Sequence, residues 1–156
     1  MPKSPTDFLF MLFETQRLLR LLAEKQAAPY GITKAQWGVL AKLERTEGLK
    51  QSELAELLDV QPITLTRLID RLCENDLIER REDAKDRRVN RLYLRPAARP
   101  LLEKLSELRA NITETALNHL NDEQANDLVR QLETIKNNVR DALQSADTKL
   151  KDQQYG

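Results

Sequence analysis

Two groups of polar side chains in the middle of the chain could make specific hydrogen bonds to a partner. In the first, short polar side chains precede two arginines that would lie one helical turn apart: Gln61, Thr64, Arg67 and Arg71. Short polar groups can approach base edges, and guanidinium groups donate to guanine or phosphate. The second group is a charged run: Lys85, Asp86, Arg87 and Arg88. A carboxylate two residues before an arginine can hold it stiffly, and such an arginine suits the electronegative minor groove of DNA.

Each group also has a plainer interpretation. On a solvated helix face, Arg67 and Arg71 would pair with the neighbouring acids Asp70 and Glu74. The run 85–88 would then be a solvated charge cluster in a mobile loop. The polar residues alone leave both interpretations open, so the elements that carry them have to decide.

The surrounding segments have the order of a winged helix-turn-helix. Residues 52–58 read as a short amphipathic helix, and a second helix follows after a break. Four apolar residues of the second helix follow 3-4 spacing and should face the core: Leu65, Leu68, Ile69 and Leu72. Two apolar-polar runs, 77–81 and 91–95, flank the charged tip as a hairpin. Because this device holds one helix in the major groove, we add Ser52 and Pro62 to the candidate DNA contacts.

Further helices are predicted on both sides of this device. The first begins at a cap, Thr6 or Asp7, and its apolar residues are too many for one narrow stripe. In so short a chain, sharing this surface with a second copy is a better explanation than an ordinary core helix. A long helix from Pro96 and a last helix capped by Asn121 carry further apolar stripes, and the tail from Ser145 should fray.

The predicted architecture is mainly α-helical with a small β-hairpin wing, in a single domain of residues 1–156. Residues 6–28 and 96–145 form dimerisation helices, and residues 33–95 form the winged helix-turn-helix region. Thr33-Lys34-Ala35-Gln36 fits a capping box, in which hydroxyl and amide side chains close the first turn of a helix.

Charge is unevenly placed along a chain of zero net charge. The pI near 6.6 argues against a wholly basic nucleic-acid binder. Residues 80–95, however, hold seven basic and three acidic residues, whereas residues 100–156 hold seven basic and ten acidic ones. A local basic patch on a neutral body suits a specific contact better than general binding of polyanions.

The sequence contains little that could hold a cofactor, a metal or a membrane. It has one cysteine, Cys73, and one histidine, His119, so a disulfide, a cysteine-rich metal site and a histidine cluster are not expected. The apolar run 8–13 is too short to span a bilayer and lacks the pattern of a signal peptide. We therefore expect a cytoplasmic protein with no cofactor and no membrane partner.

The chain resembles the MarR family of bacterial transcription regulators, and within it the SlyA-like branch. Four motifs carry the resemblance: Gly31-Ile32-Thr33 with Gln36-Trp37, Gln51-Ser52-Glu53-Leu54-Ala55, Thr66-Arg67-Leu68-Ile69-Asp70-Arg71-Leu72, and Asp86-Arg87-Arg88 before Leu92-Tyr93-Leu94. Each motif is weak alone. In this order and spacing they are specific, and the match covers nearly the whole chain.

The resemblance implies an obligate homodimer that binds double-stranded DNA at a pseudo-palindrome. The helix from Pro62 to about Glu74 would read the major groove, and Arg88, braced by Asp86, would enter the minor groove. Many members release DNA when a small aromatic acid or phenolic compound enters a crevice between the dimer and reader regions. Carried over by position, four residues would line that crevice: Arg17, Tyr30, Trp37 and Leu40. For Trp37, a plain core position is the competing interpretation.

Three residues depart from the family pattern. Lys50 and Arg95 stand where a capping threonine is common, and Asp76 stands where glycine is common before the wing. Each missing cap weakens a helix by about 1 kcal/mol without threatening the fold. Some relatives sense peroxide through a cysteine in the first helix. This chain has none there, and its Cys73 lies late in the predicted recognition helix, so no redox role is predicted for it.

Two other classes of function compete with DNA-binding regulation. An interaction protein with the same body would bind a protein instead of DNA, and the zero net charge is its best support. An enzyme is not expected, because the sequence contains no Cys/His pair, metal cluster, Gly-rich phosphate loop or nucleophile elbow.

Overall fold

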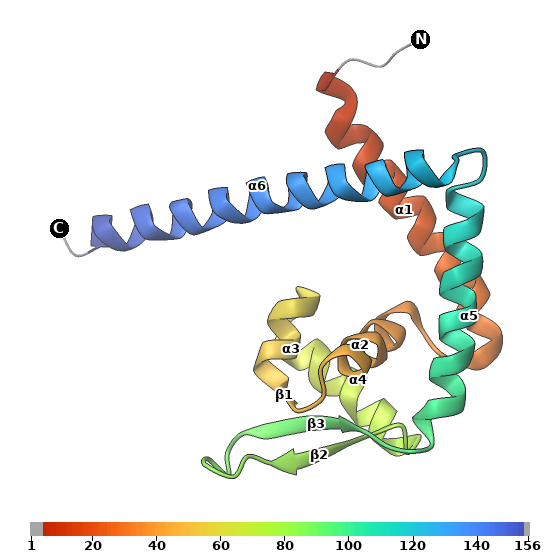
Figure 1. The fold of residues 1–156 in the computed structure, drawn as a ribbon. Helices are drawn as coiled ribbons and strands as arrows, with labels where there is room; N and C mark the ends of the chain where they lie inside the picture. Colours follow the sequence, from red (N-terminus) through yellow and green to blue (C-terminus); the bar gives the residue numbers. More distant parts are fainter. Residues whose placement is uncertain (1–4, 155–156) are drawn as a thin grey trace. The chain divides into compact units, whose positions relative to one another are not determined.

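A computed structural model describes residues 5–154, with side chains described for residues 5–147. The chain divides into two compact units, Met1–Ala116 and Leu117–Gly156, and each is considered by itself. After a short 3-10 turn, the first unit contains the following elements in chain order (Figure 1): α1 (Phe8–Ala27), α2 (Lys34–Arg45), β1 (Leu49–Lys50), α3 (Gln51–Leu58), α4 (Pro62–Glu74), β2 (Ile78–Glu82), β3 (Asn90–Leu94) and α5 (Ala98–Ala116).

The core of the first unit lies where α2, α3, α4, the sheet and α5 meet. Its fully buried side chains come from all of these elements: Leu40, Leu43, Leu54, Leu65, Ile69, Leu72, Ile78, Leu92 and Leu105. In α4, Leu65, Ile69 and Leu72 are buried, and Leu68 packs against them half-buried. The core face predicted from 3-4 spacing is confirmed, and it turns the opposite face of α4 to solvent.

The sheet has three antiparallel strands in the order β1-β3-β2. The hairpin of β2 and β3 is the predicted wing, with Arg80 opposite Leu92 and Glu82 opposite Asn90. Strand β1 was not predicted, because two residues carry no periodicity, and Leu49 finds its partner Leu92 far along the chain. The mainly helical fold with a small antiparallel wing is confirmed.

Helix α2 begins as the sequence predicts. The Thr33 hydroxyl accepts from the Gln36 N–H, and the Gln36 side chain accepts from the Thr33 N–H, at 3.1 and 3.0 Å. Asp7 takes the N-cap position of α1 but makes no side-chain capping bond. At α3, the N–H of Lys50 donates to Glu53 Oε2 at 2.8 Å. The Lys50 ammonium has no acceptor, so only this half of the box can form.

The other two departures from the family pattern lie together at the start and end of the wing. Asp76 adopts a left-handed conformation with φ 57°, a position that favours glycine. Its carboxylate lies 3.6 Å from Arg95 Nη1. The residues that replace a glycine and a capping threonine therefore form an ion pair with each other.

The second unit consists mainly of α6 (Asp122–Gln154). Asn121 and Gln124 form the predicted cap, with reciprocal bonds of 2.8 and 3.0 Å. Four large apolar side chains at helical spacing are exposed along α6: Leu128, Leu132, Val139 and Leu143. The predicted fraying from Ser145 is wrong, since the helix continues to Gln154, and residues 146–154 contain no glycine or proline that would end it. None of the described helices combines the length and apolar character needed to span a bilayer.

Candidate nucleic-acid interface

The turn between α3 and α4 fixes where α4 begins. Asp59 adopts a left-handed conformation with φ 51°, and its N–H donates to carbonyls at the end of α3. The Val60 N–H donates to the Ala55 carbonyl at 3.1 Å, which reverses the chain. Pro62 is the first residue of α4, where its missing donor costs nothing. The polar start of α4 is therefore held by backbone bonds.

The face of α4 opposite the core carries the predicted contact residues. All of these are exposed: Gln61, Pro62, Thr64, Arg67 and Arg71. Within the described residues, the side chains of Arg67 and Arg71 make no hydrogen bond or ion pair, so both guanidinium groups can bind a partner. The pairs with Asp70 and Glu74 that the plainer interpretation predicts are not formed, and Asp70 pairs instead with Arg80 of β2 at 2.6 Å.

A polar network ties α4 to α3 and to the wing. Gln51 Nε2 donates to Thr66 Oγ1 at 2.9 Å, and the Thr66 hydroxyl donates to the Pro62 carbonyl at 2.9 Å. Arg80 Nη2 donates to Asp70, while its Nε lies 3.4 Å from Gln51 Oε1. Three elements thus meet at one half-buried arginine, which fixes the orientation of α4 relative to the hairpin.

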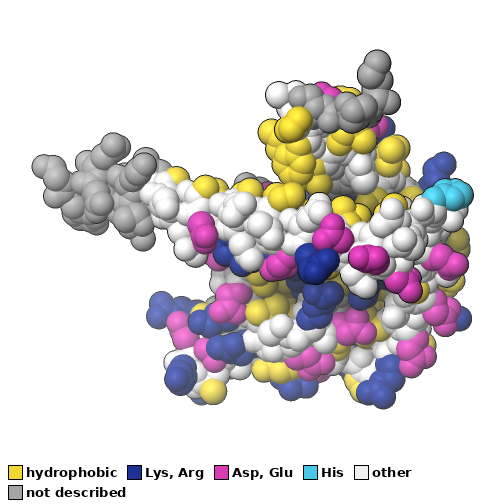
Figure 2. All heavy atoms as spheres, turned by 45° about the horizontal axis from the view of Figure 1, so that its top comes forward, with side chains coloured by type: hydrophobic (Ala, Val, Ile, Leu, Met, Phe, Trp, Pro, Cys, Tyr) yellow, Lys and Arg dark blue, Asp and Glu magenta, His cyan; other side chains and the backbone are white. Residues whose placement is uncertain are grey.

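The wing tip carries the second predicted group. Asp86 Oδ1 accepts from the Arg88 N–H at 3.0 Å and lies 3.4 Å from Arg88 Nε. The Arg88 side chain is nevertheless 93% exposed, and Lys85 and Arg87 are exposed as well. Figure 2 shows Lys and Arg side chains gathered around the wing. The predicted brace forms at the backbone and reaches the guanidinium only weakly.

Ser52 lies between the two predicted groups. With Gln61 and Pro62 it lines a hollow of about 520 Å³ between α3 and α4. With Arg88 it lines a second hollow, of about 290 Å³, at the base of the wing tip. The structure therefore brings Ser52, the start of α4 and the wing tip onto one continuous surface.

Two pKa shifts in this region have clear causes. The Arg91 guanidinium, which donates to Asp83, lowers the pKa of that carboxyl, and the Lys85 N–H adds to the effect. Burial raises the pKa of the Cys73 thiol, which is half-buried at the end of α4. A raised pKa reduces the thiolate fraction, so Cys73 lacks the activation that a redox-sensing thiol needs.

The four predicted ligand residues lie in different surroundings in the single chain. Trp37 and Leu40 are buried in the core, as the plainer interpretation of Trp37 predicts. Arg17 is exposed on α1 and pairs with Glu14 at 2.6 Å, which lowers the pKa of Glu14. Tyr30 lines a cavity of about 370 Å³ whose other walls include Leu72, Leu77 and Leu101. Of the four residues, only Tyr30 lines this cavity.

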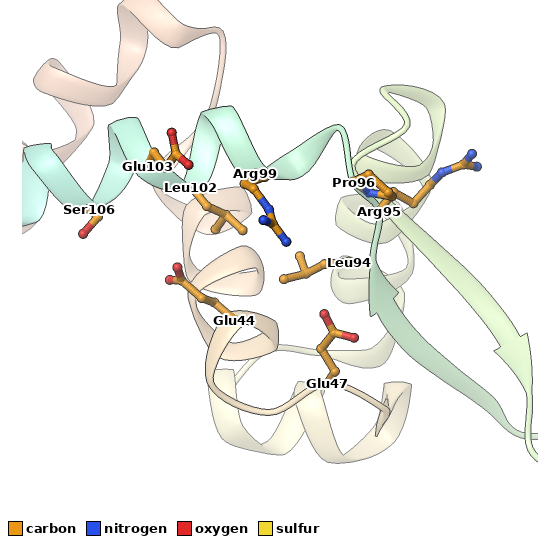
Figure 3. A pocket seen from close by; sticks show the side chains of 9 residues that line it. All are labelled: Glu44, Glu47, Leu94, Arg95, Pro96, Arg99, Leu102, Glu103 and Ser106. Atoms are coloured by element: carbon orange, nitrogen blue, oxygen red, sulfur yellow. The ribbon is translucent and has the colours of Figure 1, made fainter.

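A larger groove of about 670 Å³ lies where α2 ends, β3 ends and α5 begins. Figure 3 shows Arg99 and Glu47 pointing into it beside Leu94, whereas Glu103 points away. Mixed charge over an apolar floor would admit a polar organic molecule. None of the four predicted ligand residues lines this groove.

Two features of the surface were missed at the sequence level. Ile63, in the first turn of α4, is 63% exposed beside the polar contact residues. The supporting bonds of Gln51, Thr66 and Arg80 join residues up to 29 positions apart. The exposure of Ile63 follows from its offset from the core stripe of α4, whereas no local signal marks the long-range bonds.

Comparisons with known proteins agree with this geometry. The model of the MarR family matches residues 32–89. The HTH-type transcriptional repressor MdtR of Bacillus subtilis (strain 168) is 38% identical over 94 residues, which are 60% of this chain and 61% of MdtR. The match thus spans less than two thirds of MdtR. The uncharacterized HTH-type transcriptional regulator YwoH of the same organism is 31% identical over 110 residues, 70% of this chain and 80% of YwoH.

Solved structures show the same fold. A MarR transcriptional regulator from Methanosarcina mazei Go1 superposes with a TM-score of 0.80 at 25% identity, over 86% of this chain and 98% of that one. The transcriptional regulator SlyA superposes with a TM-score of 0.75 at 25% identity, over 85% and 94%. A mutant of MarR from E. coli, complexed with operator DNA, superposes with a TM-score of 0.72 at 20% identity, over 85% and 99%.

The relatives are named as transcription regulators, which confirms the prediction of a non-enzymatic role. The resemblance inferred from four motifs is confirmed by the family match, by YwoH and by the structural neighbours, SlyA among them. This chain belongs to the MarR family and is a transcriptional regulator with a winged-helix fold.

Proposed function

We propose that the chain is a homodimeric, sequence-specific DNA-binding regulator that recognises a pseudo-palindromic operator and responds to a small aromatic or phenolic ligand. Residues 33–95 would bind double-stranded DNA, and residues 6–28 and 96–145 would form the dimer within one domain of residues 1–156. The observation that carries the proposal is the exposed polar face of α4, where the Arg67 and Arg71 side chains have no partner among the described residues, beside a wing whose Arg88 is 93% exposed.

Several further features support contact with DNA. Gln61 and Thr64 lie at the start of α4, where short polar groups can reach base edges in the major groove. The exposed Arg88 has the reach that a minor-groove contact needs. The E. coli MarR mutant complexed with operator DNA shares this fold, and operator DNA is the kind of partner proposed here.

The second candidate function is binding of a protein partner through the same surface. The zero net charge and the exposed Leu57 and Ile63 on α3 and α4 favour it. The two functions differ in their response to salt, because phosphate contacts release counterions. Four phosphate contacts in a dimer would lower DNA affinity roughly a hundredfold between about 50 and 200 mM salt.

Fluorescence anisotropy with a labelled duplex, titrated at several salt concentrations, tests the proposal. Arg88→Ala should lower affinity about tenfold or more, since a groove contact of an arginine is worth about 1–3 kcal/mol. Lys104→Ala is the control, because Lys104 is an exposed basic residue on α5 that pairs with Glu107. A salt-independent affinity, equal for parent and Arg88→Ala, would favour the protein-binding alternative.

The ligand part of the proposal rests on the resemblance and on the cavity beside Tyr30. Its apolar walls and aromatic edge suit an aromatic ring, and Gln36, which also lines it, directly precedes Trp37. Trp37 is the single tryptophan, so its fluorescence reports binding. Titration with benzoate-type acids should change both the Trp37 emission and the affinity for DNA. No change in either quantity across a panel of aromatic acids and phenols would contradict an aromatic effector.

A further inference from the structure

We propose that Arg91 is a positioning residue for the wing: it fastens the base of the wing tip to the turn before β1, and so holds Arg88 in place to meet DNA. The inference rests on the DNA-binding function proposed above. Arg91 itself is an unsuitable DNA contact, because it lies in β3 with only 34% of its side chain exposed and its guanidinium already engaged.

The guanidinium of Arg91 joins two parts of the first unit. Its Nη1 donates to the Gly48 carbonyl at 2.7 Å, and its Nε donates to Asp83 Oδ1 at 3.1 Å. Gly48 is itself fixed, since its N–H donates to the Leu92 carbonyl at 2.9 Å. Asp83 follows the last residue of β2. One side chain therefore links the turn between α2 and β1 to the start of the wing tip.

Hydrogen bonds continue from Asp83 to Arg88 without a gap. The Asp83 N–H donates to the Val89 carbonyl at 2.9 Å, which closes the tip. The Val89 N–H donates to the Asp86 carbonyl at 3.0 Å, and Asp86 Oδ1 accepts from the Arg88 N–H at 3.0 Å. The position of Arg88 thus depends on where Asp83 is held.

Local charge makes Arg91 necessary for this arrangement. Across the three strands, Arg91 lies between Lys50 and Arg81, so three basic residues stand side by side. Their repulsion is offset at Asp83, whose side chain is only 12% exposed. Without Arg91, this carboxylate would lose its guanidinium partner in a poorly solvated position, which is costly. The tip would loosen, while the opposite face of β3, with the buried Leu92, would stay packed.

Hydrogen exchange in the DNA-free protein tests the link directly. In Arg91→Ala, the tip amide of Val89 should exchange about fivefold faster or more. Opening of the tip in this variant no longer requires the Arg91 hydrogen bonds to break, so the open state is populated more often. Arg81→Ala is the matched control: Arg81 stands directly opposite Arg91, but its partners are Glu79 and Tyr93. Exchange at Val89 that is unchanged in Arg91→Ala, or equally raised in Arg81→Ala, would overturn the proposal.

A double-mutant cycle tests whether Arg91 acts through Arg88. Arg88→Ala should cost about tenfold in DNA affinity in the parent, but less than about threefold in the Arg91→Ala background. Arg91→Lys should lose most of the DNA affinity that Arg91→Ala loses, because a lysine ammonium cannot replace the two-pronged guanidinium in both hydrogen bonds. Independent, additive losses would mean that Arg91 contacts DNA itself and would overturn the positioning role.

The two experiments separate this inference from the proposed function. If the parent protein binds no DNA duplex, the proposed DNA-binding function is contradicted. The proposal that Arg91 positions Arg88 to contact DNA is then contradicted as well. The exchange result would still decide whether Arg91 orders the tip. If Arg91→Ala unfolds, Asp83→Ala removes the Arg91–Asp83 bond from its other end and should give the same rise in exchange and the same loss of coupling to Arg88.

Discussion

At the residue scale, two glycines adopt the left-handed conformation in different surroundings. Gly31 has φ 68° and open space where a Cβ would lie, whereas Gly48 has φ 78° and would place a Cβ 3.1 Å from the Tyr93 hydroxyl. Gly31→Ala should lower the unfolding free energy by about 1 kcal/mol, the cost of the backbone conformation. Gly48→Ala should lower it by about 2 kcal/mol or more, because overpacking adds to that cost.

Urea denaturation followed by the fluorescence of Trp37 measures both losses on the same chain. Equal losses would show that Tyr93 moves aside at no cost, and would contradict a tightly fixed turn at Gly48. This turn matters for the interface because its carbonyl receives the Arg91 guanidinium at 2.7 Å.

At the scale of elements, the wing tip should loosen in acid. The pKa of Asp83 lies below its ordinary value of 3.8, because Arg91 and the Lys85 N–H bind the charged form. On unfolding, the pKa returns toward that ordinary value, so the unfolded chain binds the proton more readily. The stabilisation from Asp83 is therefore complete above about pH 4 and is lost as the pH falls through the lower pKa of the folded state.

Denaturation of the parent and Asp83→Asn across this pH range measures that contribution. At neutral pH, Asp83→Asn should be the less stable protein, and the difference should shrink as the pH falls below about 4. Glu103→Gln is a suitable control, because Glu103 makes no ion pair within the described residues. A difference between parent and Asp83→Asn that stays constant with pH would contradict the charge-assisted bond.

At the scale of the whole molecule, we expect the exposed apolar surface of α1 to be buried against a second protein chain. In Figure 2, apolar side chains gather on α1 toward its N-terminal end, where Phe10 and Phe13 are 70% and 66% exposed. Monomers rarely expose so large an apolar patch, and obligate dimers cover such surfaces. Helix α6 separately presents its own apolar stripe.

We expect the parent to sediment as a dimer, and Phe10→Glu with Phe13→Glu to sediment as a monomer at the same concentration. Leu57→Glu is the control, since Leu57 is 54% exposed on α3 but lies outside the proposed dimer helices. A monomeric parent, or a double variant that remains dimeric, would contradict the assignment of α1 to the dimer interface.

The sequence predicted those parts of the fold that depend on neighbours along the chain. The core stripe of α4 and its start at Pro62 follow from 3.6-residue periodicity and from the chemistry of proline. Strand β1 escaped prediction, because two residues become a strand only by pairing with β3. The pairing of Asp70 with Arg80 is likewise a tertiary contact between α4 and the wing.

The same distinction between local pattern and tertiary contact applies to the candidate DNA interface. The positions of Arg67, Arg71 and Arg88 could be predicted from local spacing. The freedom of Arg67 and Arg71 to bind a partner could not, because Asp70, their neighbour on α4, is taken by Arg80 of β2. Of the four predicted ligand residues, Trp37 and Leu40 are buried in the core, whereas Arg17 is exposed and Tyr30 lines a cavity. That a second copy completes a pocket around Tyr30 stays a prediction.

Selection of bound duplexes from a random-sequence pool tests the central claim most directly, with Arg67→Ala and Arg88→Ala beside the parent. The parent should enrich a two-fold symmetric motif whose half-site centres lie about one helical turn, or 10–10.5 bp, apart. Arg67→Ala should relax the motif at positions read in the major groove, and Arg88→Ala should relax flanking positions read in the minor groove. A folded, dimeric parent that enriches no motif would contradict DNA reading by this surface.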